Sequence, residues 1–251
     1  MPNVCPQLLQ PYQSWKENLK RMREARLRYQ TSGAQEDKVA FDEALKQANA
    51  AQLAYRTQAY DTRIDYKGSK LCQLEATIME RIDRLLVGSG GNRVQIKIVD
   101  GRITTFDVSQ STSTSLNEAV SFVVYLTELQ ELYCYNTPIS KLPDTLPDSL
   151  QKLYCSHTTI STLPDTLTDS LQTLSCYNTK ISSLPDTLPD SLQWLFCHDT
   201  QISKLPDTLP DSLRWLFCYN TQISKLPDTL PDSLQRLHCY NTQISELPNT
   251  L

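Results

Sequence analysis

The apolar positions in the second half of the chain recur with a fixed period of 21 residues. Five full copies and one incomplete copy each begin with a leucine, at Leu129, Leu150, Leu171, Leu192, Leu213 and Leu234. With positions numbered 1 to 21, the consensus reads L-Q-x-L-x-C-x-N-T-x-I-S-x-L-P-D-T-L-P-D-S. Leu at position 4 and Cys at position 6 alternate with variable residues at positions 3, 5 and 7. This alternation predicts one short strand with a single buried face in every copy.

The rest of each copy turns back without a helix. The consensus has two prolines per copy, at positions 15 and 19, as at Pro206 and Pro210. Prolines at this spacing exclude a helical return segment. The return is therefore expected to be extended and polyproline-like, with Ile at position 11 and Leu at positions 14 and 18 facing inward. Because one copy cannot bury its apolar face alone, the copies should stack into a single parallel sheet over one continuous core.

The pattern LPxxLPxxLxxLxCxxTxIxxLP resembles the short leucine-rich repeats of bacterial secreted effectors, which have the same double Leu-Pro on the convex side. The resemblance covers about half of the chain. It implies an α/β solenoid shaped like a horseshoe, with the parallel sheet on the concave face. Two positions differ from that family, since position 6 is Cys in place of Val or Leu and position 9 is Thr in place of Asn.

Some members of the effector family have a C-terminal ubiquitin-ligase domain with a catalytic cysteine. This sequence ends at Leu251 within the repeats, so the resemblance does not carry that activity over. The three histidines, His157, His198 and His238, lie at repeat positions 8, 7 and 5 and do not align into one site. The ladder cysteines that could pair with them are expected to face the core. We therefore expect no catalytic residues and no enzyme activity.

The first third of the chain has a helical pattern. A capping box at Ser14–Glu17 predicts the start of a first helix. Periodic apolar residues predict a second helix over residues 34–66 and a third over residues 71–87. Gly88–Gly91 then predicts a flexible joint. Residues 1–91 are thus interpreted as an N-terminal helical domain, in which the first two helices form an antiparallel hairpin.

Residues 92–128 are interpreted as a β-hairpin cap and an aberrant first repeat. Asp100–Gly101 stands between two alternating segments, which is typical of a two-residue hairpin. The second segment, Ile103–Val108, matches L-x-x-L-x-L, and Val94–Val99 would cover the exposed edge of the sheet. A short helix should fill the gap before residues 129–251, the six repeats. The residues expected to cap this helix or to face inward are Ser115, Glu118, Leu116, Ala119, Val120, Val123 and Val124.

Charge is unevenly distributed along the chain. Residues 1–102 contain 17 basic and 12 acidic side chains, whereas residues 103–251 contain 7 basic and 16 acidic ones. An acidic repeat region disfavours nucleic acid as a partner. The first twenty residues have no apolar core of the kind a signal peptide needs. The longest apolar-rich run, Ala119–Leu126, is too short to span a bilayer.

Six of the eight cysteines occupy position 6 and form what is called here the cysteine ladder: Cys134, Cys155, Cys176, Cys197, Cys218 and Cys239. Neighbouring strands lie about 4.8 Å apart with parallel side chains, whereas a disulfide needs Cβ atoms about 3.8 Å apart and facing each other. Buried free thiols are therefore predicted, and with them a reducing, cytoplasmic compartment. Secretion without a signal peptide stays open.

The alternative to buried free thiols is a ladder that binds a soft metal. The ladder lacks the short paired cysteine spacings of metal sites, so no metal or cofactor is expected. Cys5 and Cys72 stay unassigned.

Positions 3, 5 and 7 should project from the strands onto the concave face, where they form an aromatic band with tryptophans on adjacent strands. Clustered solvent-facing aromatic residues indicate an interaction site. The alternative is that neighbouring rings cover one another and stabilise only the sheet. The candidate binding residues are Tyr133, Tyr135, Tyr154, Tyr177, Trp194, Phe196, His198, Trp215, Phe217, Tyr219, Arg236, His238 and Tyr240.

Two classes of function follow from this pattern. The first is a non-enzymatic module that binds another protein, effector-like in its setting, with carbohydrate binding as a variant because aromatic platforms also stack on sugars. The second is a structural protein that self-assembles. The strand Arg236–Tyr240 of the sixth copy would be the last in the sheet, so weak homodimerisation through that end is expected.

Overall fold

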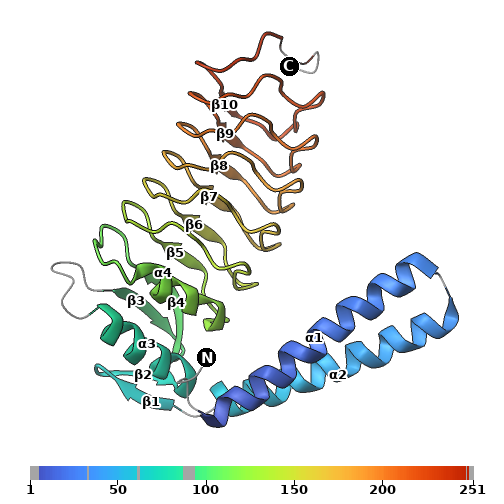
Figure 1. Cartoon of the computed structure of the whole chain (residues 1–251), viewed down its shortest axis with the longest axis vertical. Coiled ribbons are helices and arrows are strands. Elements are labelled where there is room, and N and C mark those ends of the chain that lie inside the picture. Colours follow the sequence, from blue (N-terminus) through green and yellow to red (C-terminus); the bar gives the residue numbers. More distant parts are fainter. Residues whose placement is uncertain (1–5, 33, 61–62, 87–93, 247, 249–251) are drawn as a thin grey trace. The chain divides into compact units, whose positions relative to one another are not determined.

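The computed structural model describes residues 6–32, 34–60, 63–86, 94–246 and 248 (Figure 1). Contacts divide the chain into two compact units, Met1–Arg81 and Ile82–Leu251. Each unit is described by itself.

The first unit is built on two long helices, α1 (Pro6–Ser32) and α2 (Gln35–Tyr60), which lie side by side and antiparallel. Ala25 and Ala48 are their buried apolar residues among those described, and such small side chains allow two helices to approach closely. The predicted helix start at Ser14 is wrong, because α1 already begins at Pro6. Proline is favoured in the first turn of a helix, where its missing N–H is not needed.

The predicted second helix is too long, because residues 63–66 form a strand. After α2, β1 (Arg63–Tyr66) pairs antiparallel with β2 (Ser69–Cys72). Lys67 and Gly68 between them have φ angles of 48° and 82°, as a two-residue hairpin turn of type I′ requires. The predicted third helix also begins too early, since α3 spans Gln73–Leu86. Val87 and Gly88–Gly91 lie outside the described residues.

The second unit contains an eight-stranded sheet in the order β10-β9-β8-β7-β6-β5-β4-β3. β3 (Gln95–Val99) pairs antiparallel with β4 (Arg102–Asp107), and Asp100 and Gly101 at the turn have φ angles of 48° and 72°. All later pairs are parallel. The strands of the six copies are β5 (Glu131–Tyr133), β6 (Lys152–Tyr154), β7 (Thr173–Ser175), β8 (Trp194–Phe196), β9 (Trp215–Phe217) and β10 (Arg236–His238).

β4 occupies the place of a repeat strand in the sheet, next to β5 and in parallel register with it. Phe106 pairs with Leu132 of the first full copy, and Ile103, Phe106 and Val108 are all at most 3% exposed. β3 lies beside β4 at the end of the sheet, the place that the hairpin pattern predicted for it.

A short helix fills the gap after β4, as predicted, but its cap differs. α4 (Leu116–Ser121) continues into the 3₁₀ turn η1 (Phe122–Tyr125). The Ser115 side chain makes no cap hydrogen bond, and the φ and ψ angles of Ser115, −88° and 6°, are not those of a typical N-cap. Asn117 instead connects α4 to the first copy, since its Oδ1 accepts the Ser140 N–H at 3.0 Å. Val124 is half-buried rather than buried.

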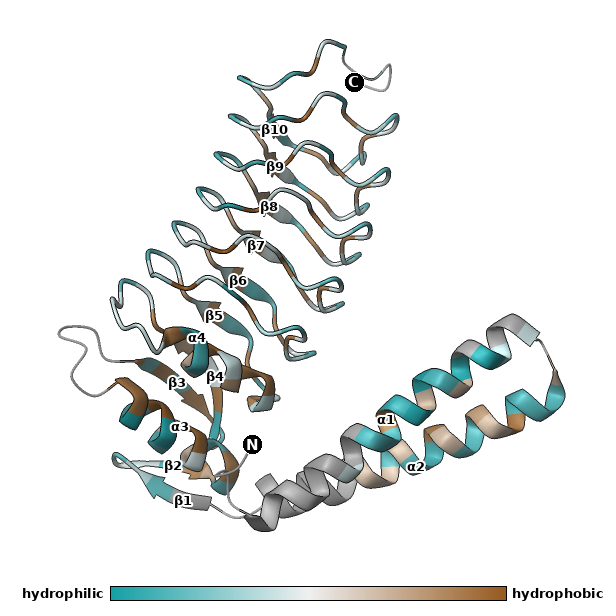
Figure 2. Ribbon diagram, in the orientation of Figure 1, coloured by the Kyte–Doolittle hydropathy of each residue, from teal (hydrophilic) through white to brown (hydrophobic). Residues whose placement is uncertain are grey.

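Hydrophobic residues recur at equivalent places in successive turns of the solenoid, as the colours of Figure 2 show, and they form one continuous core. In the first five copies, the side chains at positions 1, 4, 6 and 11 are all 0% exposed, as at Leu192, Leu195, Cys197 and Ile202. A fully buried aliphatic side chain stabilises the fold by about 1.5–3 kcal/mol, so this repeated burial accounts for the fixed period. The stacked parallel strands and their inward leucines are those that the sequence predicted.

Polar side chains close the turn that follows each strand. The hydroxyl of Thr at position 9 donates to the carbonyl of the Cys three residues earlier, at 2.6–2.7 Å in all six copies. Position 8 has a left-handed backbone in every copy, with φ between 51° and 55°. Asn, Asp and His tolerate this conformation better than most residues, which explains the residues found there: Asn136, His157, Asn178, Asp199, Asn220 and Asn241.

The cysteine ladder faces inward, as predicted, with one exception in its degree of burial. The first five ladder cysteines are 0% exposed, and burial raises the pKa of the Cys134, Cys176 and Cys218 thiols to about 12. Cys239 is only half-buried.

Because the thiolate is the reactive form, alkylation of the native protein should reach Cys239 first and the other five only after denaturation. Peptide mass spectrometry over a labelling time course measures this order, and rapid native labelling of any of the five would contradict it.

Candidate interaction face

The side chains at positions 3, 5 and 7 form three rows across β5–β10 on the concave face, and all thirteen predicted binding residues belong to these rows. Row 3 consists of Glu131, Lys152, Thr173, Trp194, Trp215 and Arg236. Row 5 consists of Tyr133, Tyr154, Ser175, Phe196, Phe217 and His238. Row 7 consists of Tyr135, Ser156, Tyr177, His198, Tyr219 and Tyr240. The parallel register places each residue of rows 3 and 5 directly beside the next, and in row 7 ring contacts join the last four residues.

The N-terminal end of this face contains a self-sufficient ion pair. The Lys152 ammonium lies 2.7 Å from the Glu131 carboxylate, which also accepts the Tyr133 hydroxyl at 3.2 Å. The hydrogen bond from Lys152 lowers the pKa of Glu131 and the same bond raises the pKa of Lys152. Burial, reinforced by Glu131, raises the pKa of Tyr133 to about 12. These charges satisfy each other and leave little to attract a ligand.

Small residues interrupt the aromatic band in the middle. Thr173 and Ser175 on β7 are 4% and 3% exposed, and Ser156 beside them is 4% exposed. Larger neighbours on the adjacent strands therefore cover them. The interruption separates the stacked pair Tyr133–Tyr154, with ring centroids 4.9 Å apart, from the aromatic residues of β8–β10.

Row 7 ends in a stack of four rings, Tyr177, His198, Tyr219 and Tyr240. Successive centroids lie 4.4, 4.3 and 4.5 Å apart, with interplanar angles of 11°, 19° and 9°. The spacing of the strands, about 4.8 Å, is close to these centroid distances, so each strand contributes one ring. The faces of these rings cover one another, and their edges and polar atoms border the concave face.

The C-terminal aromatic patch, defined as Trp194, Phe196, Trp215 and Phe217, lies beside this stack. Phe196 and Phe217 meet edge to face with centroids 5.2 Å apart, and the rings of Trp215 and Phe217 are nearly parallel with centroids 6.2 Å apart. All four side chains are half-buried, so the expectation of fully solvent-facing tryptophans is wrong. Aromatic contacts cover part of Phe196, Trp215 and Phe217, and each of the four side chains keeps a part exposed.

Arg236 and His238 border the patch on β10. The Arg236 guanidinium carbon lies 4.3 Å from the Trp215 ring centroid, and the His238 ring lies 4.3 Å from Phe217. Tyr135, at the start of row 7, is half-buried, and Tyr240, at its end, is 56% exposed. The predicted residues thus divide into a stacked pair at one end and a larger continuous group at the other.

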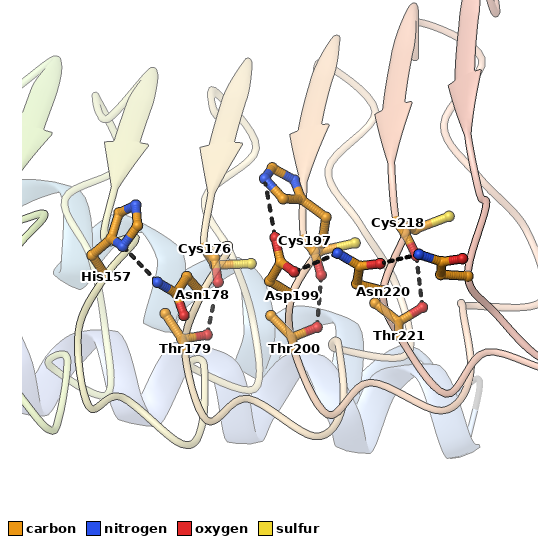
Figure 3. A network of polar contacts seen from close by, with 12 residues as sticks. His157, Cys176, Asn178, Thr179, Cys197, Asp199, Thr200, Cys218, Asn220 and Thr221 are labelled. Atoms are coloured by element: carbon orange, nitrogen blue, oxygen red, sulfur yellow. Dashed lines mark hydrogen bonds and ion pairs between the residues drawn. The ribbon is translucent and has the colours of Figure 1, made fainter.

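A polar network runs beside row 7 along position 8, as Figure 3 shows. Asn241 Nδ2 donates to Asn220 Oδ1 at 2.9 Å, and Asn220 Nδ2 donates to Asp199 Oδ1 at 2.7 Å. Asn178 Nδ2 and His157 Nδ1 lie 2.6 Å apart. Only a polar residue at position 8 in every copy signals this network in the sequence.

His198 is the buried titratable residue of this region. Its ring lies between those of Tyr177 and Tyr219, and the residue is 8% exposed. Its Nδ1 has no hydrogen-bond partner among the described residues. Nε2 lies 4.0 Å from Asp199 Oδ2. Burial lowers the pKa of His198, while Asp199 acts in the opposite direction and His157 adds to the lowering.

His198 should therefore make the stability of the fold depend on pH. Because its folded pKa lies below the unfolded value of about 6.5, the unfolded chain binds more protons as the pH falls through that value. Stability is then lost on acidification, whereas above the unfolded pKa the group has no effect. His198→Phe keeps a ring in the stack and removes the titration, so its melting temperature should fall less than that of the wild type between about pH 8 and about pH 5.5. Circular dichroism melts measure this, and equal pH dependence in the two proteins would refute it.

The ladder cysteines and two of the histidines lie on different sides of the sheet. Position 6 faces the core while positions 5 and 7 face outward, so the ladder thiols and the imidazoles of His198 and His238 lie on opposite sides of the sheet. Within the described ranges, no group of three or more His, Cys, Asp or Glu side chains is arranged to hold a metal ion. No described helix is both long enough and apolar enough to cross a membrane.

Comparisons with known proteins identify the fold. No protein-family model matches this chain, and no curated protein matches it. Among solved structures, the functional domain of InlJ from Listeria monocytogenes, described as including a cysteine ladder, is 26% identical with a TM-score of 0.52. The match covers 57% of this chain and 31% of that one. This likeness supports a leucine-rich repeat solenoid.

Two further solved structures are similar over part of the chain. YopM from Yersinia enterocolitica is 23% identical over 50% of this chain and 36% of its own, with a TM-score of 0.33. The leucine-rich repeat protein LIC12759 from Leptospira interrogans is 21% identical over 57% of this chain and 50% of its own, with a TM-score of 0.34. In each of the three comparisons, the match covers half or less of the other chain.

Proposed function

Because the chain is a leucine-rich repeat solenoid with aromatic rings gathered on its concave face, we propose that it is a non-enzymatic module that binds another protein through β8–β10. The observation that supports this most strongly is the C-terminal aromatic patch, whose four rings stay partly exposed on neighbouring strands. Tryptophan, tyrosine and arginine are the residues that contribute most often to the binding energy of protein interfaces.

A comparison between the copies argues that these rings are not needed for folding. Row 3 has Trp194 and Trp215 on two strands but Lys152 and Thr173 on two others, and all four strands pair in the same register. Positions 1, 4 and 11, by contrast, are the same in all five full copies. The solenoid therefore requires its core residues and tolerates a range of side chains on the concave face, so the aromatic patch is free to serve recognition.

The charge on this face supports a protein partner over a nucleic acid. In the three rows, the only Lys or Arg side chains are Lys152 and Arg236, and Lys152 is paired with Glu131. Binding to a phosphate backbone needs several cations along one surface. A cluster of aromatic side chains beside one guanidinium is instead typical of protein interfaces.

The orientation of the rings disfavours carbohydrate binding. A sugar stacks on the open face of an aromatic ring, but in row 7 the ring faces are covered by their neighbours at 4.3–4.5 Å. An effector-like setting, in which the partner belongs to another cell, rests on the resemblance of the repeats and stays part of this proposal. Self-assembly is the competing function, and sedimentation of the chain over a dilution series measures it as binding between copies.

The test is selection of a random peptide library displayed on phage against the immobilised full chain. Selected clones should bind the wild type and should lose most of their binding to Trp194→Ala/Trp215→Ala. The matched control is Lys204→Ala/Asp207→Ala, which removes an exposed ion pair of 2.9 Å at positions 13 and 16 and leaves the net charge unchanged. Two results would contradict the proposal. One is that the clones bind the tryptophan variant as tightly as the wild type. The other is that they bind the tryptophan variant but fail to bind the control variant. Circular dichroism confirms that both variants are folded.

A further inference from the structure

We infer that the partner presents a carboxylate beside an apolar side chain, that Arg236 binds the carboxylate, and that Trp215 and Phe217 contact the apolar group. This inference rests on the proposed function and specifies the chemistry of the partner.

The Arg236 side chain is held in place by an aromatic ring. Its guanidinium carbon lies 4.3 Å from the Trp215 centroid, and the two residues are directly paired across β9 and β10. A guanidinium that rests on an indole uses its face for that contact and keeps the N–H donors around its edge for hydrogen bonds. Less side-chain entropy is then lost when a carboxylate binds these donors.

Of the two cationic side chains in rows 3, 5 and 7, Lys152 and Arg236, only Arg236 has no carboxylate within ion-pair distance among the described residues. Lys152 in the same row is paired with Glu131 at 2.7 Å. Lys141, Lys204 and Lys225, at position 13, are paired with Asp residues three positions later at 2.6–3.1 Å. The exposed Arg236 is thus a cation of the concave face that a ligand can still neutralise.

The surroundings of Arg236 favour an incoming anion. On β8–β10, rows 3, 5 and 7 contain no Asp or Glu. Asp199, at position 8, already accepts a hydrogen bond from Asn220 and lies near His198. The edges of aromatic rings are electropositive, so the ring edges of the patch add to the attraction. A carboxylate therefore meets positive charge and no competing carboxylate within these rows.

The size of this site fits one carboxylate rather than an acidic tract. A single guanidinium forms two parallel hydrogen bonds with one carboxylate, and the residues next to it, Trp215 and Phe217, are aromatic. An Asp or Glu side chain flanked by a large apolar residue, in an exposed segment of a protein, satisfies both parts of the site. The same group could be supplied by a C-terminal carboxylate, which the experiment separates from an internal one.

The test repeats the phage selection with variants of Arg236, using a library whose peptides are unmodified and have no free C-terminus. The wild type should enrich peptides with Asp or Glu beside an apolar residue, and Arg236→Glu should enrich Lys or Arg at the same place. Arg214→Ala is the matched control, because it removes an exposed arginine from the adjacent copy and should preserve the acidic preference.

A selected peptide is then synthesised with its acidic residue intact and with that residue changed to the amide. The change should weaken binding to the wild type about tenfold, as loss of a charge-assisted hydrogen bond does, and should have little effect on binding to Arg236→Ala.

Equal weakening in both proteins, or enrichment of peptides without acidic residues, would overturn the inference. If Trp194→Ala/Trp215→Ala loses binding while Arg236→Ala does not, the proposed function stands and this inference fails. If a peptide with a free C-terminus alone binds, the internal acidic residue is the wrong source.

Discussion

Replacing Leu195 by alanine should lower the free energy of unfolding by about 3 kcal/mol, as the loss of a fully buried leucine does. Leu195 is 0% exposed at the centre of β8, and its partners in the sheet, Leu174 and Leu216, are 0% exposed as well. The cavity left by the substitution would therefore be enclosed by neighbours on both sides. Urea unfolding followed by circular dichroism measures the loss.

The matched control is Leu237→Ala, the same substitution at position 4 of β10. Leu237 is only half-buried and pairs with Leu216 on one side among the described strands. Since burial in a solenoid comes from the neighbouring copies, its loss should cost about half as much, or less. Equal losses at the two positions would mean that the copies do not stabilise one another in the way the structure indicates.

Replacing Trp215 by alanine should weaken the binding of a selected peptide about 30-fold, which corresponds to about 2 kcal/mol for an aromatic anchor. It should also lower the free energy of unfolding by about 1 kcal/mol. The stability cost arises because the indole is half-buried against Phe217 and Arg236. Titration calorimetry and urea unfolding measure the two effects separately.

The control for this prediction is Tyr154→Ala. Tyr154 is also half-buried in an aromatic contact, with Tyr133, but it lies in the other group of rings. Its loss should change stability by a similar amount and affinity very little. If Trp215→Ala loses stability and keeps its affinity, the rings of β8–β10 only pack against each other, and the interaction site must lie elsewhere.

Much of the solenoid could be predicted from the sequence, because each copy repeats the same burial. Leucine or isoleucine at positions 1, 4 and 11 is 0% exposed in all five full copies, so the pattern in one copy is reinforced by the others. The β3–β4 hairpin could be predicted for a different reason. Asp100–Gly101 supplies two residues that adopt positive φ readily.

The N-terminal elements were harder to predict because each occurs once. The segment Arg63–Tyr66 continues a helical spacing of apolar residues, and its pairing with β2 depends on the Lys67–Gly68 turn. The capping motifs at Ser14 and Ser115 are local patterns that neighbouring residues override, since α1 begins earlier and α4 makes no side-chain cap. Such short signals are not reinforced by repetition.

The candidate site was predicted in its location but not in its packing. Strand alternation alone places Trp194, Trp215 and the other row residues on one face. It does not show that Trp215 packs beside Phe217 and under Arg236, or that both tryptophans are half-buried. The burial of His198 between two tyrosines likewise depends on side-chain geometry that the repeat pattern does not contain.

The most direct measurement of partner binding at the concave face is the fluorescence of its tryptophans. The chain has three tryptophans, so Trp15→Phe leaves Trp194 and Trp215, both in row 3, as the only emitters. Acrylamide should quench these two less efficiently once a selected peptide is bound at saturation, because the peptide covers their exposed parts. Unchanged quenching at a peptide concentration that calorimetry shows to be saturating would contradict binding at the aromatic patch.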